Sequence, residues 1–401
     1  MPIADSEADP AALDAFLALA GAEKWRLRVR DLGARTQRGR FAGRAAQQRH
    51  ALELVLDRLN NPALLAKAGR PERRLLAFVR EAAQLAASLE PGPRARLQML
   101  IAEGLEGEGT LTPLFHLLRT AALLRARGFE VRHDGLLHGT SYDMLVRREG
   151  ALAEVACETL SADEGRPLQR GDWASLVDRV NPELQTWLAA HPGRYILKMT
   201  LPEDVSEKNR IGELHGRISA MLAAERRQDA SADAVLKLDP LVLAGAQAAG
   251  DPQRALPERL RDLFGLDAHL AVTADPTSGS VMVMAARAGR ENEIAQAAKR
   301  RLAAAAPARL TGRHPGILAL FLDDLDAAEW RGLRDTLELE GVVRRFLTEP
   351  PARAVVAVTC ATRQELLALP DAAPEGELRF RNPGHPRAKC QGLEPAIISS
   401  N

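Results

Sequence analysis

The hydrophobic pattern of the chain changes its period at Gly128, and this change restricts the folds that the central part can adopt. Up to that glycine, apolar residues recur at the spacing of one helix face: Leu114, Leu117, Leu118 and Ala121. The pattern predicts a helix over residues 112–127, with Thr112 as its N-cap. Beyond Gly128 apolar and polar residues alternate, which predicts extended segments within residues 129–147.

Acidic residues lie on two neighbouring predicted strands, and the first of these is the end of the segment 129–147. The second of these strands covers residues 152–159. Because successive side chains of a strand point to opposite faces, Glu154, Ala156 and Glu158 share one face. Asp143 on the preceding strand joins them if the register of the hairpin allows it. Clustered carboxylates repel one another and resist desolvation, so this cluster predicts a divalent cation, Mg2+ or Mn2+, with oxygen ligands.

A helix over 172–190 and a strand containing Lys198 come next, and we expect them to complete the core. The order is then helix, strand with Asp143, strand with Glu154, helix, strand. This order resembles the PD-(D/E)xK (restriction endonuclease-like) nuclease superfamily, whose motif is matched at Asp143 and at Glu154-Val155-Ala156. The resemblance implies an α/β fold with a mixed β-sheet core flanked by helices.

The same resemblance implies a function. A member of this superfamily would be a metal-dependent nuclease that hydrolyses phosphodiester bonds in DNA or RNA, with DNA favoured, in defence against foreign DNA or in repair. Asp143 and Glu154 would ligate Mg2+ or Mn2+, and Glu158 would support them.

The chain departs from the family motif at Ala156, where a lysine is expected. That lysine helps to activate the attacking water and stabilises charge in the transition state, and a methyl group can do neither. Three interpretations stay open. Lys198 has taken over the role, the site is naturally inactive, or Ala156 is an introduced substitution. An inactive chain would be a catalytically silent module that binds nucleic acid or a protein partner.

Residues 1–110 are predicted to form a helical N-terminal domain or arm, ahead of a nuclease-like α/β core over 111–401. Between its first two predicted helices the arm carries an excess of cations, and four of them are the candidate nucleic-acid-binding residues: Arg35, Arg38, Arg40 and Arg44. Such a segment can neutralise phosphates, and Trp25 or Phe41 could stack on a base. The alternative is a solvated helix face whose arginines pair with acidic residues elsewhere.

The C-terminal half contains two segments that are apolar on both faces, 316–322 and 354–360. This pattern predicts central strands covered by helices, which extend the same sheet, and a separate C-terminal α/β domain is the alternative. The segment 245–262 is rich in Gly, Pro, Gln and charged residues, and it is predicted to be a mobile connection.

The composition of the chain limits its possible partners and its location in the cell. The net charge of the 401-residue chain is +1, so any nucleic-acid surface must be local. The three cysteines have no metal-ligand spacing, and an odd number argues against a disulfide framework. Neither a signal peptide nor a membrane-spanning segment is visible, which predicts a cytoplasmic protein without a membrane partner. A homo-oligomer or a protein partner is left open.

Overall fold

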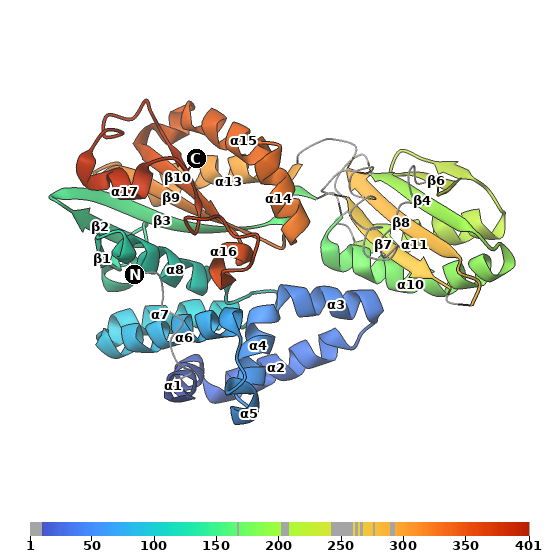
Figure 1. Cartoon of the computed structure of the whole chain (residues 1–401), viewed down its shortest axis with the longest axis horizontal. Helices are drawn as coiled ribbons and strands as arrows, with labels where there is room; N and C mark the ends of the chain where they lie inside the picture. Colours follow the sequence, from blue (N-terminus) through green and yellow to red (C-terminus); the bar gives the residue numbers. More distant parts are fainter. Residues whose placement is uncertain are drawn as a thin grey trace. The chain divides into compact units, whose positions relative to one another are not determined.

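The structure is a computed structural model that describes residues 10–166, 168–201, 208–241, 260, 264, 268–275, 277–288 and 293–400. The chain is mixed α/β and divides into two compact units. Unit 1 comprises residues 1–34, 47–162 and 295–401, and unit 2 comprises residues 35–46 and 163–294. Figure 1 shows the elements of both units along the chain.

Unit 1 contains a six-stranded sheet in the order β1-β2-β3-β9-β10-β11. Its strands are β1 (Glu130–Arg132), β2 (Met144–Arg148), β3 (Ala151–Ser161), β9 (Gly316–Asp323), β10 (Val355–Ala361) and β11 (Leu378–Arg381). β1, β2 and β3 are antiparallel neighbours, whereas β3, β9 and β10 run parallel and β11 is antiparallel to β10. The prediction that the two apolar C-terminal segments extend the acid-bearing sheet is therefore confirmed.

Helices cover both faces of this sheet, which explains why every residue of β9 and β10 is buried. On one face lies α8 (Thr112–Ala126), the helix predicted before Gly128. On the other side Figure 1 shows α13 (Glu293–Arg309) and α15 (Glu338–Leu347). The expected N-cap is wrong: Leu111 occupies that position, and the Thr112 hydroxyl instead donates to Asp323 Oδ2 at 3.0 Å.

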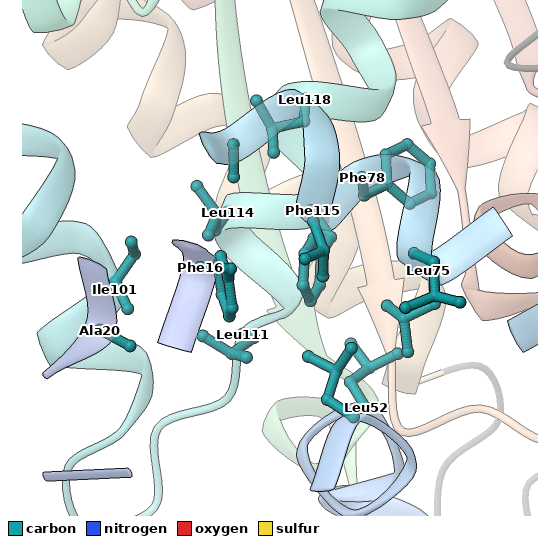
Figure 2. Close-up of a cluster of buried hydrophobic side chains, with 14 of the residues drawn as sticks. Phe16, Ala20, Leu52, Leu75, Phe78, Ile101, Leu111, Leu114, Phe115 and Leu118 are labelled. Carbon is teal, nitrogen blue, oxygen red and sulfur yellow. The ribbon is translucent and has the colours of Figure 1, made fainter. Parts of the chain in front are cut away.

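The N-terminal region is helical, as predicted. Its helices are α1 (Pro10–Ala20), α2 (Ala22–Thr36), α3 (Arg40–Arg49), α4 (Ala51–Leu59), α5 (Pro62–Leu65), α6 (Arg70–Ser88) and α7 (Pro91–Gly104). All of these helices except α3 share one hydrophobic cluster with α8 in unit 1, in which Phe16 and Phe115 stack with ring centroids 6.2 Å apart (Figure 2). This cluster also reaches Phe321 at the end of β9. The division into units therefore does not follow the predicted boundary at residue 110, because these helices and the sheet have a common core.

Several short elements complete unit 1. They are α9 (Asp134–His138), η1 (Ala162–Gly165), α14 (Ala327–Asp335), η2 (Pro350–Ala354), α16 (Arg363–Leu367), η3 (Gln391–Leu393) and α17 (Glu394–Ile397). Leu337 adopts a left-handed conformation with φ of 57° and separates α14 from α15.

Unit 2 has its own five-stranded sheet in the order β5-β6-β4-β8-β7. The strands are β5 (Gln228–Ala230), β6 (Val235–Pro240), β4 (Arg194–Leu201), β8 (Val281–Ala288) and β7 (His269–Ala274). The helices α10 (Arg170–Ala190) and α11 (Lys208–Ala223) bury their apolar sides with one face of this sheet.

The assignment of residues 172–190 and the Lys198 strand to the acid-bearing core is therefore wrong. Both elements exist, but they belong to the second sheet, and the helix and strand that follow β3 in the first sheet are α13 and β9. Local periodicity gives the type of an element. The strand with which it pairs is decided by long-range packing.

Apart from Leu260, the predicted mobile connection over 245–262 lies outside the described residues. Among the helices that the structure describes, none has both the length and the apolar composition needed to cross a membrane.

The buried histidine of α8 leads to a prediction about acid stability. His116 is 1% exposed, its Nε2 lies 2.9 Å from the Ala319 carbonyl oxygen, and burial lowers its pKa to about 3. Below the usual pKa of histidine the unfolded chain binds a proton that the folded chain does not. This difference should cost unit 1 about 2 kcal/mol by pH 5, with full stability above pH ~6.5.

Urea unfolding of the parent and of His116→Gln at pH 7.5 and pH 5 measures this effect. Glutamine does not titrate, so the variant should lose less stability between the two pH values than the parent. His138→Gln, at an exposed position, is the control and should behave like the parent. An equal loss in the parent and in His116→Gln would contradict the prediction.

Candidate functional site

The register of β2 and β3 gathers the acidic residues predicted from the sequence. Leu145 pairs with Glu154 and Met144 with Val155, so Asp143, just before β2, lies opposite Ala156. The Asp143 amide donates to the Val155 carbonyl oxygen at 3.0 Å. The side chains on the other face of β3 belong to a hydrophobic cluster that also contains residues of α8. The expected alternation is thus observed, and the carboxylates of Asp143, Glu154 and Glu158 are on one face.

Arg309, the last residue of α13, supplies positive charge to this cluster. Its guanidinium donates to Asp143 Oδ2 at 2.7 Å, to Glu158 Oε1 at 2.5 Å and to the Ser141 carbonyl oxygen at 2.6 Å. Arg301, two turns earlier on α13, lies 3.8 Å from Glu158 Oε2. The guanidinium of Arg309 therefore bridges two of the three carboxylates.

Asp143 is held by a second donor as well. Its Oδ2 accepts a hydrogen bond from the Cys157 amide at 2.7 Å. Burial raises the pKa of Asp143, and the charge of Arg309 acts in the opposite direction. The cost of burying this carboxylate is thus offset in part by protein donors.

The carboxylate of Glu154 on β3 has its own hydrogen-bond donors, which come from the loop between α13 and β9. It is 1% exposed, its Oε2 accepts from the Thr311 amide at 2.8 Å, and its Oε1 accepts from the Thr311 hydroxyl. Two residues of one short segment, Arg309 and Thr311, therefore supply donors to all three carboxylates.

The donors around these carboxylates bear on the expected Mg2+ or Mn2+ site. Both oxygens of Glu154 face Thr311, and one oxygen each of Asp143 and Glu158 faces Arg309. In the described ranges no group of three or more His, Cys, Asp or Glu side chains is arranged to hold a metal ion. In this arrangement the residues do not fit a divalent cation, because a guanidinium lies between two of the intended ligands.

The third motif position and its candidate replacement lie in different units. Ala156 is fully buried on β3 in unit 1. Lys198 lies on β4 in unit 2, where its Nζ is 2.9 Å from Asp239 Oδ2 and 5.9 Å from the centre of the Phe264 ring. Unit 1 therefore brings Asp143, Glu154, Ala156 and Glu158 together, whereas Lys198 belongs to the sheet of unit 2.

The basic segment is divided between the units. Arg35, Arg38, Arg40 and Arg44 fall within residues 35–46 of unit 2. Three of them are exposed and Arg35 is half-buried. Two cations that precede these arginines in the sequence have partners in unit 1. Arg28 is buried and donates to the carbonyl oxygens of Gly107 and Gly109, and Lys24 forms an ion pair with Glu106.

A carboxylate fixes the start of α3, the helix that carries Arg40 and Arg44. Asp178 on α10 accepts from the amides of Phe41 at 3.0 Å and of Ala42 at 2.8 Å, which caps α3. A Cβ at Gly39 would lie 2.2 Å from Asp178 Oδ2, so glycine permits this contact. The arginines of α3 are therefore displayed from a fixed helix.

The proposed base-stacking role of the aromatic residues is not supported by their burial. Trp25 is 4% exposed and meets Phe16 edge to face with ring centroids 6.5 Å apart. Phe41 is partly buried against the core of unit 2. Both rings are used in packing.

The sequence reasoning missed Arg309 and Thr311. The available signal was their place between a helix and a strand that is apolar on both faces. Using it required the knowledge that this strand, β9, pairs with β3.

Comparison of the chain with models of protein families, with curated proteins and with solved structures found no match.

The bridging arginine can be tested through stability. Arg309→Gln should destabilise unit 1 by about 2 kcal/mol, because it removes the cation that bridges two partly buried carboxylates, Asp143 and Glu158. Adding Asp143→Asn and Glu158→Gln should recover most of the loss, since the repulsion then disappears. Urea unfolding at pH 7.5 gives these values.

The matched control is Arg313→Gln, at an exposed position of the same loop. It removes the same charge and should change stability by less than about 0.5 kcal/mol. If Arg309→Gln is no more destabilising than this control, the guanidinium does not hold the cluster together.

Proposed function

We propose that this chain is a nuclease-derived protein that binds nucleic acid, with DNA favoured over RNA, and does not hydrolyse it. The observation that carries the proposal is the guanidinium of Arg309 between Asp143 and Glu158. It provides, from within the chain, the positive charge that a metal ion would otherwise supply to these carboxylates.

The order of elements in unit 1 supports a nuclease-like origin. The helix α8 precedes the antiparallel strands β1, β2 and β3, and α13 then leads into β9, which runs parallel to β3. This is the order of helix, acid-bearing strands, helix and strand on which the resemblance to the PD-(D/E)xK superfamily rests. Residues 163–294 of unit 2 come between β3 and α13 in the sequence.

The side chains at the motif positions support catalytic silence. Ala156 offers a methyl group where the family's lysine would act on water and on the developing charge. Glu154 is engaged by Thr311 through both oxygens. Hydrolysis would therefore need a different water activator and a displaced arginine, whereas binding needs neither.

The exposed arginines at the start of unit 2 support nucleic acid as the partner. Arg38, Arg40 and Arg44 are exposed, and none of them forms an ion pair with an acid among the described residues. Arg40 and Arg44 lie on α3 and Arg38 lies just before it. Unpaired arginines in such positions can each contact a phosphate and release condensed counterions. The charge of the whole chain is close to zero, so this local excess is the relevant one.

Fluorescence anisotropy with a labelled DNA duplex over a range of salt concentrations tests the proposal. The parent should bind in EDTA without any need for Mg2+, should bind no more tightly when Mg2+ is added, and should leave the duplex intact. The triple variant Arg38→Gln, Arg40→Gln, Arg44→Gln should bind more weakly, and its logarithmic salt slope should be smaller by about 2 to 3, roughly one for each lost phosphate contact.

A matched control removes three arginines that already pair with acids in unit 1: Arg26, Arg58 and Arg147. Their replacement by Gln should leave the salt slope close to that of the parent. Absence of salt-dependent binding in the parent would remove nucleic acid as the partner. Cleavage that requires Mg2+ and is lost in Asp143→Asn would instead establish a metal-dependent nuclease.

A further inference from the structure

A second charged site lies in unit 1, away from the carboxylates on β3. It is a cavity of about 720 Å³ at the C-terminal end of α15, between η2 and the loop 382–386 that follows β11. Ligand sites in proteins commonly have volumes of about 300 to 1,000 Å³, so this cavity is large enough for a nucleotide.

The cavity is positively charged. Three arginines line it, Arg344, Arg353 and Arg381, and the acid among the lining residues is Glu349. That acid is already paired, because Lys299 of α13 approaches it to 2.6 Å. Arg344 also has a partner, Glu340, at 2.6 Å.

The other two arginines have no such partner. Within the described ranges, no side-chain hydrogen bond or ion pair is formed by Arg353 or Arg381. Arg353 is exposed and Arg381 is half-buried, so together they give the cavity positive charge that an anion can neutralise.

The wall of the cavity is fixed by hydrogen bonds. Asn382 is 7% exposed, its Nδ2 donates to the Val355 carbonyl oxygen at 2.8 Å, and its Oδ1 accepts from the Gly384 amide at 3.1 Å. These bonds hold the loop against the start of β10. Leu347 and Pro383 add apolar surface to the lining. The cavity therefore combines a preformed apolar wall with unpaired cations.

We propose that this cavity binds a phosphomonoester of nucleotide size, with Arg353 and Arg381 on the phosphate and the apolar wall against the remainder of the ligand. Guanidinium groups match phosphate because their donors form a planar fork that makes paired, charge-assisted hydrogen bonds. A lone sulfate-sized anion would leave most of the volume unfilled, and a neutral ligand would leave the arginines unpaired. The site goes beyond the proposed function, because none of its residues belongs to the carboxylate cluster or to α3.

Two sources provide the same chemistry, a free mononucleotide and the 5′-phosphate at the end of a nucleic-acid strand. Isothermal titration calorimetry of the full chain with adenosine 5′-monophosphate is the primary test, and adenosine is the probe without phosphate. The parent should bind the nucleotide and not the nucleoside. Arg353→Gln and Arg381→Gln should each weaken binding about tenfold, as expected for loss of a hydrogen bond to a charged group.

The control variant is Arg345→Gln. Arg345 is an exposed arginine on α15 next to the cavity but not in its lining, so the variant removes the same charge and should bind within about twofold of the parent. Unchanged near-ultraviolet circular dichroism establishes that each variant is folded. Equal affinity for adenosine and its monophosphate, no binding of the monophosphate, or equal weakening in Arg345→Gln would each overturn the proposal.

A DNA strand with a 5′-phosphate, compared with the same strand ending in a hydroxyl, distinguishes the two sources. Binding that is tighter for the phosphorylated strand, by a margin lost in Arg353→Gln, supports a strand end as the ligand. Equal binding of the two strands, with the mononucleotide still bound, supports a free nucleotide. The hydroxyl strand also reports on the proposed nucleic-acid surface of unit 2, so failure of that function and failure of the cavity give different results.

Discussion

The parallel pairing of β3 with β9 is the interaction on which unit 1 depends. It joins the acid-bearing hairpin to the C-terminal half of the chain across residues 163–294, which form most of unit 2. It also sets where the loop before β9 lies, because Glu154 pairs with Gly316 and the segment 309–311 then stands beside the carboxylates. A Cβ at Gly316 would lie 2.3 Å from Leu310 Cδ1, so a glycine at this register position lets the loop approach. The fold core and the candidate site are therefore consequences of one strand pairing.

The buried and partly buried carboxylates of unit 1 are compensated by cations and hydrogen-bond donors from elsewhere in the chain. Three carboxylates on one sheet face would destabilise the fold unless cations or donors met them. Here α13 and its following loop provide these groups through Arg309, Arg301 and Thr311. The same helix neutralises Glu349 through Lys299 at the edge of the arginine-lined cavity. One helix thus offsets most of the negative charge of the acidic cluster and pairs the acid that lines the cavity.

Sequence patterns located most of the elements. The structure contains the helix predicted before Gly128 and the hairpin of β2 and β3, with Asp143 just before β2 and Glu154 on β3. It also contains the apolar strands near 316–322 and 354–360. The facing of Glu154, Ala156 and Glu158 was also correct, because the alternation of side chains along a strand is a local property. Lys198 was misassigned for the opposite reason. An apolar strand after a helix has the same pattern in either sheet, and the intervening segment gives no sign that a second sheet has begun.

The sequence by itself determined the type of most elements, which side chains share a strand face, and that Glu154 and Glu158 lie on one of those faces, which Asp143 joins through the register of the hairpin. Only the tertiary structure decided what meets those acids. Arg309 and Thr311 reach them from more than 140 residues further along the chain. Likewise, Arg353 and Arg381 come together through the antiparallel pairing of β10 with β11. The physical reason is the same in both cases: periodicity records the environment of each residue, whereas strand pairing over long sequence separations is selected by the packing of the whole core.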